Sequence, residues 1–181
     1  AEALVAAMRT NADAAEGDIR FQAKGTEALQ DIEHVDEARP LGVEQSNVSL
    51  AFGDKGLLKI YRRLRAGEQP DIEIARFLTE KTEFKNTPAF LGEATLSTRG
   101  KDDVATIAAC FAFVPNQGDG WKAVVDALTR ELQDRSFGDG AEVETVPDGA
   151  AYPYPLDLAG IFGQRTAELH IALATPTDDP A

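Results

Sequence analysis

The chain has 181 residues, 43 % of them hydrophobic, and a formal net charge of −13 with a pI near 4.5. The hydrophobic fraction is sufficient for one folded domain, with or without an appendage, and argues against wholesale disorder. The acidity argues against nucleic acid and anionic membrane surfaces as partners, because clustered lysine and arginine bind both. One cysteine and two histidines exclude an intrachain disulfide and argue against a zinc site. No apolar run is long enough to span a bilayer and the first residues lack a signal-peptide pattern, so we expect a cytoplasmic protein.

Hydrophobic periodicity predicts an α+β fold, an antiparallel sheet packed by helices. The strand predicted at 104–114 is apolar almost throughout, which indicates burial on both faces. In chain order, we predict a helix at 2–9, a strand at 18–23, three strands within 40–62, a helix at 70–81, strands at 88–98 and 104–114, and helices at 121–135 and 156–174.

The helix predicted at 70–81 begins with features typical of a helix N-terminus. Pro70 suits its first turn, and Asp71 and Glu73 suit its positive end. Glu73 lies one helical turn before Phe77, which places it beside the apolar stripe that we predict. That stripe consists of Ile74, Phe77 and Leu78.

A lysine interrupts the apolar strand L-L-K-I-Y-R at 57–62. Burying its ammonium group without a partner would be costly. Strand alternation places Lys59 on the same face as Leu57 and Tyr61. Lys59 is either a side chain that reaches water from an edge strand or a charge that meets an acidic partner.

The order of parts around Lys59 matches that of a protein-kinase N-terminal lobe. In such a lobe a turn covers the triphosphate, a strand lysine reaches its oxygens, a helix glutamate orients the lysine, and a hinge strand meets the adenine. Here Glu73 follows Lys59 by fourteen residues, and F-V-P-N ends a later apolar strand. Spacing alone does not establish such a lobe, because many sheets carry a lysine followed by a helix with a glutamate.

Four longer blocks resemble the maltokinase family, whose members are often fused behind trehalose synthase. They are L-G-V-E-Q-S-N-V-S-L-A-F-G-D-K-G-L-L-K-I-Y-R-R-L, P-D-I-E-I-A-R-F-L-T-E, F-V-P-N-Q-G-D-G-W and G-Q-R-T-A-E-L-H-I-A-L-A. The resemblance implies a kinase-like fold related to aminoglycoside phosphotransferases. It also implies transfer of the ATP γ-phosphate, with Mg²⁺, to maltose, giving maltose 1-phosphate for glucan synthesis.

The resemblance also implies roles for individual residues and a division of the chain. It makes residues 1–37 a cap-like segment, 38–114 the kinase-like N-lobe and 115–181 the truncated start of a helical C-lobe. Ser46 and Asn47 have an alternative role as turn formers that bond to their own backbone. The implied nucleotide-binding residues are Lys59 for the phosphates, Glu73 as its partner, Ser46 and Asn47 in the phosphate-covering turn, and Phe113 and Val114 in the hinge; Asn116, Gln117 and Asp119 follow near the cleft.

The sequence departs from the family where the catalytic groups should lie. The family's His-Gly-Asp loop, with its general base, and its later Mg²⁺-binding Asp are absent. We therefore predict no catalytic residue and no metal ligand in this chain, and expect it to be inactive alone. It is either a piece of a longer kinase or a stand-alone front half. The alternative function is a non-catalytic binding or regulatory module in trehalose or glycogen metabolism.

Overall fold

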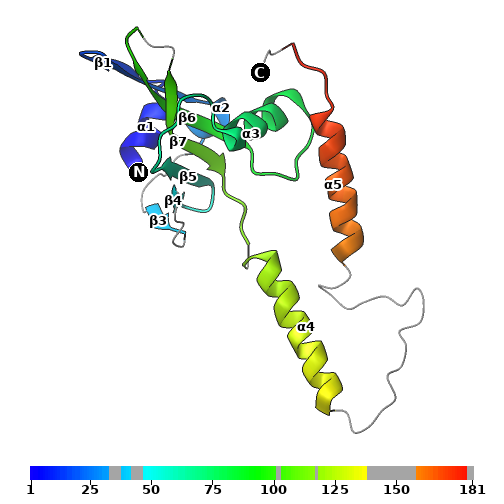
Figure 1. Ribbon diagram of the computed structural model, residues 1–181. Helices are drawn as coiled ribbons and strands as arrows, with labels where there is room; N and C mark the ends of the chain where they lie inside the picture. The colour runs from blue at the N-terminus through cyan, green and yellow to red at the C-terminus, as the bar shows by residue number, and fades with distance from the viewer. Residues whose placement is uncertain (33–37, 42–46, 101–102, 117, 138–157, 179–181) are drawn as a thin grey trace. The chain divides into compact units, whose positions relative to one another are not determined.

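The computed structural model describes residues 1–32, 38–41, 47–100, 103–116, 118–137 and 158–178 (Figure 1). The chain forms two compact units, Ala1–Pro115 with Ala172–Ala181, and Asn116–Ile171. The elements, in chain order, are α1 (Glu2–Arg9), β1 (Asp13–Glu16), β2 (Ile19–Gly25), α2 (Glu27–Gln30), β3 (Ala38–Pro40), β4 (Asn47–Phe52), β5 (Gly56–Tyr61), α3 (Pro70–Lys81), β6 (Phe90–Thr98), β7 (Val104–Ala112), α4 (Gly120–Phe137) and α5 (Ala159–Leu173).

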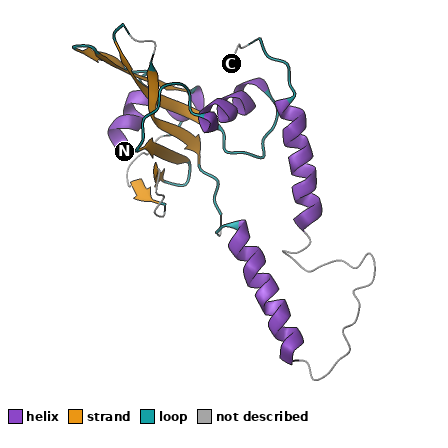
Figure 2. Ribbon diagram, in the orientation of Figure 1, coloured by secondary structure: helices purple, strands orange, loops and turns teal. Residues whose placement is uncertain are grey.

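Seven strands form one antiparallel sheet in the order β1-β2-β6-β7-β5-β4-β3 (Figure 2). The predicted α+β class and antiparallel sheet are confirmed. β7 occupies the centre of the sheet, and its residues 108–111 are buried. Burial of this strand on both faces, as predicted, is therefore confirmed for its middle.

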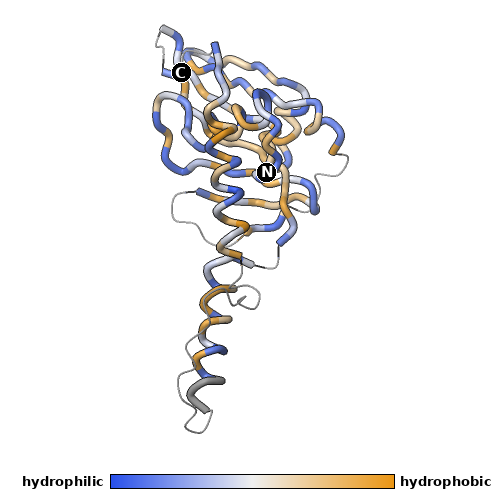
Figure 3. The backbone as a smooth tube through the Cα atoms, turned by 90° about the vertical axis from the view of Figure 1, so that its right-hand side faces the viewer, coloured by the Kyte–Doolittle hydropathy of each residue, from blue (hydrophilic) through white to orange (hydrophobic). Residues whose placement is uncertain are grey.

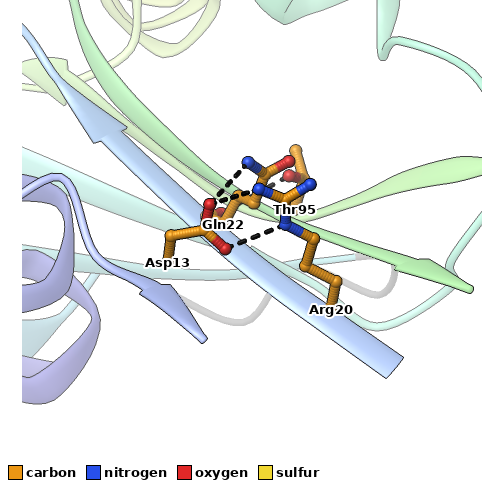
Figure 4. Close-up of polar contacts among 4 residues, drawn as sticks. All are labelled: Asp13, Arg20, Gln22 and Thr95. Carbon is orange, nitrogen blue, oxygen red and sulfur yellow. Dashed lines mark hydrogen bonds and ion pairs between the residues drawn. The ribbon is translucent and has the colours of Figure 1, made fainter. Parts of the chain in front are cut away.

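The sequence patterns did not predict β1, which pairs with β2 in a hairpin. All four residues of β1 are exposed, so the strand shows no hydrophobic alternation. Side-chain contacts accompany the backbone pairing: Arg20 donates two hydrogen bonds to the Asp13 carboxylate, and the Gln22 amide donates a third at 3.2 Å (Figure 4). Because Asp13 and Arg20 are exposed, these contacts set the pairing of the hairpin more than its stability.

The sheet has a hydrophobic cluster on each face, with α1 and α2 contributing to one and α3 to the other. Along β7, Ala108 and Cys110 belong to the first cluster, while Ala109 and Phe111 belong to the second, as strand alternation requires. The buried residues of the first cluster are Val5, Met8, Ala23, Leu29, Ile32, Phe52, Leu58, Leu91, Ala94, Ala108 and Cys110. Those of the second are Tyr61, Ile72, Ala75, Phe90, Ala109 and Phe111.

Two glycines allow the first layer of helices to approach the sheet closely. Gly25 on β2 and Gly92 on β6 face each other in the pairing. A Cβ atom at Gly25 would lie 2.6 Å from the Met8 carbonyl oxygen of α1, and one at Gly92 would lie 2.6 Å from the Lys24 carbonyl oxygen. Any larger residue would push α1 or β2 away, so the packing of this layer depends on both glycines.

The division of the chain into cap-like segment, N-lobe and C-lobe stays a prediction. β2 lies within the predicted cap-like segment 1–37, yet it belongs to the same sheet as the strands of the predicted N-lobe. It pairs with β6 over seven register positions, from Ile19 opposite Thr98 to Gly25 opposite Gly92.

The unit Asn116–Ile171 holds α4, along which hydrophobic and hydrophilic residues alternate (Figure 3). None of the described helices is both long and apolar enough to cross a membrane.

Candidate functional site

Lys59 lies on β5, an interior strand between β7 and β4, and its side chain meets α3. Its Nζ donates a hydrogen bond of 2.7 Å to Oδ2 of Asp71, and 24 % of the side chain stays exposed. Tyr61 donates from its hydroxyl to the same oxygen at 2.9 Å. The ammonium group also lies 5.6 Å from the centre of the Tyr61 ring, within reach of a cation–π attraction. The lysine is therefore not an edge-strand residue, and an acid from the following helix meets its charge.

The acid that meets Lys59 is Asp71, and the predicted pairing with Glu73 is not formed. The cause is the rotational phase of α3. Ile74 is 47 % exposed, and the buried stripe consists of Ile72, Ala75 and Leu78 rather than the predicted set. At about 100° per residue, Asp71 lies at the edge of this stripe, whereas Glu73 lies nearly opposite it.

The hydrogen bonds that join Lys59, Tyr61 and Asp71 affect the pKa values of Asp71 and Tyr61. Partial burial would raise the pKa of Asp71, but the hydrogen bonds from Lys59 and Tyr61 outweigh it and hold that pKa below its ordinary value. Burial, and secondly the bond to Asp71, raises the pKa of Tyr61 far above that of a free phenol. At neutral pH, Asp71 is therefore an ionised acceptor and Tyr61 a protonated donor.

Arg76 forms a second ionic cluster, which links α3 to the sheet at a point further along the helix than Asp71. Nη1 of Arg76 lies 2.9 Å from the carboxylate of Glu68, and its buried Nη2 lies 2.8 Å from that of Glu93 on β6. The contact with Glu93 is an ion pair without hydrogen-bond geometry. The guanidinium group also lies over the Phe90 ring, 5.0 Å from its centre. Arg76 thus joins the helix to the loop before it and to β6.

Residues of β4 complete the surface around Lys59. Strand register places Ser49 opposite Lys59 and Asn47 opposite Tyr61, so all four side chains share the α3 face. Ser49 is buried, with 8 % exposure, and the sequence reasoning missed it because a lone serine in a strand carries no distinctive pattern. Ser46, the other predicted member of the phosphate-covering turn, lies outside the described residues.

The predicted hinge begins at Phe113, whose backbone is already engaged. Its N–H donates to the Lys55 carbonyl oxygen at 2.9 Å and prolongs the pairing of β5 with β7. The Arg39 guanidinium group lies 5.6 Å from the centre of its ring. Val114 follows, 54 % exposed, and Pro115 has no N–H group to donate. The N–H of Phe113 is therefore engaged within the sheet, and the purine-binding role of Phe113 and Val114 stays a prediction.

The polar residues that follow the hinge act locally. The Asn116 side chain accepts a hydrogen bond from the Gly118 N–H, and Asp119 accepts one of 2.7 Å from the Lys122 N–H. The second contact is a side-chain cap on the first turn of α4. Gln117 lies outside the described residues.

The described part of the chain contains no group of three or more His, Cys, Asp or Glu side chains placed to hold a metal ion. Asp71, the acid beside Lys59, is committed to Lys59 and Tyr61. These residues do not fit a magnesium site, and no chemical step through a metal is assigned to them.

The architecture is that of a kinase-like lobe: an antiparallel sheet in which an interior strand carries a lysine that pairs with an acid of the adjacent helix. A glucosamine kinase in crystal form A matches with a TM-score of 0.59 and 22 % identity, over 96 % of this chain and 34 % of its own. A glucosamine kinase in complex with glucosamine, ADP and inorganic phosphate gives 0.60 and 22 %, over 96 % and 35 %. Crystal form B gives 0.58 and 23 %, over 99 % and 38 %. At these identities the likeness shows the fold.

A curated relative is the glucosamine kinase of Mycolicibacterium smegmatis, 28 % identical over 136 residues, which are 75 % of this chain and 30 % of that protein. The chain thus spans about a third of the length of the relatives it matches. No protein-family model matches it. These comparisons confirm the implied kinase-like fold but give no support to the maltokinase assignment or to trehalose synthase as a partner.

Proposed function

We propose that this chain is the nucleotide-facing lobe of an ATP-dependent sugar kinase, in which Lys59 contacts the nucleotide phosphates. The proposal rests on the Lys59 ammonium group, which is hydrogen-bonded to Asp71 while 24 % of the lysine side chain stays exposed to solvent. An ammonium group has three N–H donors, so the bond to Asp71 leaves donor capacity for phosphate oxygens. Lysine is an established phosphate ligand as a point charge.

In this proposal ATP arrives as its Mg²⁺ complex, and the described residues include no group of three or more His, Cys, Asp or Glu side chains placed to hold that ion. Asn47, on the Lys59 face of the sheet, is the described member of the predicted phosphate-covering turn, and Phe113 and Val114 are the predicted purine contacts; Ser46 lies outside the described residues. By the family resemblance, turnover requires a general base and a metal-binding Asp that the four similar blocks do not contain. The chain alone is therefore expected to bind nucleotide without transferring its phosphate.

For the sugar, we propose a hexosamine of the glucosamine type. The relatives that match this chain are glucosamine kinases, and one of their structures contains glucosamine and ADP. Maltose is the alternative, because the four sequence blocks resemble maltokinases. Phosphoryl-transfer assays with both sugars, on the full gene product, distinguish the two.

The second candidate is a non-catalytic module that binds nucleotide for regulation, and a sequence without a His-Gly-Asp loop is compatible with both candidates. The gene sequence after Ala181 discriminates between the candidates. A His-Gly-Asp loop within the next hundred or so codons supports the enzyme, and a stop codon supports the module.

Removal of the Lys59 charge tests the nucleotide site. We expect Lys59→Ala to abolish the chemical-shift changes that ATP causes in NMR spectra of the wild-type chain, while the sheet stays folded. A saturable ATP response in Lys59→Ala close to that of the wild type would contradict the assignment.

A matched pair of variants identifies the acid that supports Lys59. Asp71→Asn is expected to weaken ATP binding about tenfold, because it removes the charge that orients the ammonium group. Glu73→Gln, two residues along the same helix, is the control and should bind ATP as the wild type does. The reverse pattern would restore the predicted pairing with Glu73.

A further inference from the structure

Three residues of the site meet at a single oxygen atom, which one of them, Asp71, supplies. Lys59 and Tyr61, which flank Ile60 on β5, both donate to Oδ2 of Asp71, at 2.7 and 2.9 Å. The three differ in how firmly the fold holds them. The Asp71 side chain is 40 % exposed and that of Lys59 is 24 % exposed, whereas Tyr61 is 8 % exposed.

Tyr61 is the rigid member because it is part of the second hydrophobic cluster. Its ring packs among residues of α3, β6 and β7 that include Ile72, Phe90 and Ala109. Its hydroxyl therefore projects from a fixed position. Long, partly exposed side chains such as lysine lose rotamer entropy when one geometry is imposed on them, and such contacts are weak unless something pre-organises them.

We propose that Tyr61 is a positioning residue for the phosphate-binding lysine. Its hydroxyl fixes the Asp71 carboxylate, the carboxylate fixes the Lys59 ammonium group, and the ring supports that group from the side. The role rests on the proposed function, because it presumes that Lys59 meets a nucleotide. Tyr61 itself touches no phosphate in this arrangement and acts through Asp71.

The competing explanation is purely structural. A buried tyrosine hydroxyl needs a hydrogen-bond acceptor, and Asp71 would satisfy it without any effect on Lys59. The two explanations differ in what a loss of the hydroxyl does. Loss of the hydroxyl raises the Asp71 pKa under both explanations, because the bond to Asp71 is broken in either case, but only a positioning role also weakens the affinity for nucleotide.

Tyr61→Phe is the decisive variant because it keeps the ring and removes only the hydroxyl. We expect the dissociation constant for ATP, measured by NMR titration, to rise about three- to tenfold. We also expect the Asp71 carboxyl pKa, followed by carbon NMR without nucleotide, to rise, because the carboxylate loses one of its donors.

Thr79→Val is the matched control on the same helix. The Thr79 hydroxyl accepts a hydrogen bond from the Phe90 N–H at 2.9 Å, so its loss also breaks a contact between α3 and the sheet, but away from Lys59. We expect this variant to lower the unfolding midpoint while the ATP affinity and the Asp71 pKa stay unchanged.

The outcomes separate this inference from the proposed function. A wild-type chain that gives no ATP response contradicts the proposed function. An ATP response that Tyr61→Phe leaves unchanged, an Asp71 pKa that does not rise, or equal effects of Tyr61→Phe and Thr79→Val would overturn the positioning role alone.

Discussion

At the scale of single residues, Asp71 combines a structural and an electrostatic task. Its carboxylate receives two donors at one oxygen, so it links β5 to the first turn of α3. The positive end of a helix also favours an acid in that turn. The same carboxylate therefore stabilises the N-terminus of the helix, links the helix to the strand and pairs with the lysine.

This arrangement predicts a dependence of stability on acid. The folded-state pKa of Asp71 lies below its ordinary value of 3.8, so its contribution is fully present above the unfolded-state pKa and is lost as the pH falls through the folded-state pKa. We expect the free energy of unfolding of the wild type to fall more steeply below about pH 4 than that of Asp71→Asn. The difference should be modest, because solvent screens a carboxylate this exposed.

Urea unfolding of both proteins between pH 3 and pH 7 measures this difference. Other carboxylates titrate equally in the two proteins, so the difference isolates Asp71. Parallel pH profiles would show that Asp71 is not linked to folding.

At the scale of elements, α3 is the part on which the candidate site depends, and two ionic contacts hold it. Its first turn is tied to β5 through Asp71, and its middle is tied to β6 through Arg76. The two contacts lie five residues apart on one helix. Release of the second contact should therefore loosen the helix without removing any group of the site.

Arg76→Met tests this contact while keeping the apolar length of the side chain. It leaves Glu93, whose side chain is 17 % exposed, without its cation, so we expect a loss of about 1–3 kcal/mol in the free energy of unfolding. Hydrogen exchange should show faster exchange of the α3 amides. Combining Arg76→Met with Glu93→Gln should recover part of the loss, because the uncompensated charge is gone.

Lys122→Met provides the comparison for a surface ion pair. Lys122 pairs with Asp126 one helical turn later, and both side chains are more than half exposed, at 71 % and 55 %. Its replacement should leave the free energy of unfolding nearly unchanged, because solvent screens so exposed a pair. A similar effect of Arg76→Met and Lys122→Met would mean that the Arg76 cluster does not hold the helix.

The helix α3 also shows how far the sequence allowed the structure to be predicted. Its position, its proline start and the presence of an acid for Lys59 followed from local signals. Its rotational phase did not, because Ile72, Ile74, Phe77 and Leu78 permit two apolar stripes. Packing against Tyr61 and Phe90 selects the stripe with Ile72, and with it Asp71 instead of Glu73.

The strands were predictable where a hydrophobic pattern marks them and not where polar contacts form them. The alternation around Lys59 and the burial of β7 were read correctly from the sequence. β1 carries no such pattern, and its side-chain contact between Arg20 and Asp13 exists only after the hairpin has formed. The order of the strands was also beyond reach, because no local pattern specifies which distant strands become neighbours.

At the scale of the whole molecule, the division into two units predicts that the sheet does not need the second unit. All seven strands and the three helices that pack on them lie before residue 116. We expect a variant ending at Pro115, which removes the second unit together with the Ala172–Ala181 segment of the first, to keep its strand content in circular dichroism, to unfold cooperatively in urea and to retain the lowered pKa of Asp71. Loss of cooperative unfolding would show that the segment after Pro115 is required for the lobe.

The second unit carries apolar side chains on its surface. Along α4, Trp121, Val125, Leu128 and Leu132 occur at helical spacing and are between 39 % and 81 % exposed. Exposed residues of this kind reduce solubility more than they affect the fold. The variant ending at Pro115 should for this reason also be the more convenient form for NMR.

The strand order has a consequence for synthesis on the ribosome. β6 and β7, the last strands to be made, occupy the middle of the sheet and separate β2 from β5. Until both have left the exit tunnel, the earlier strands have only their hairpin neighbours and leave open edges, which invite association between nascent chains. The sheet is therefore completed late, when its two central strands are added. Slow translation just before Phe90 would prolong the interval in which the nascent chain needs a chaperone.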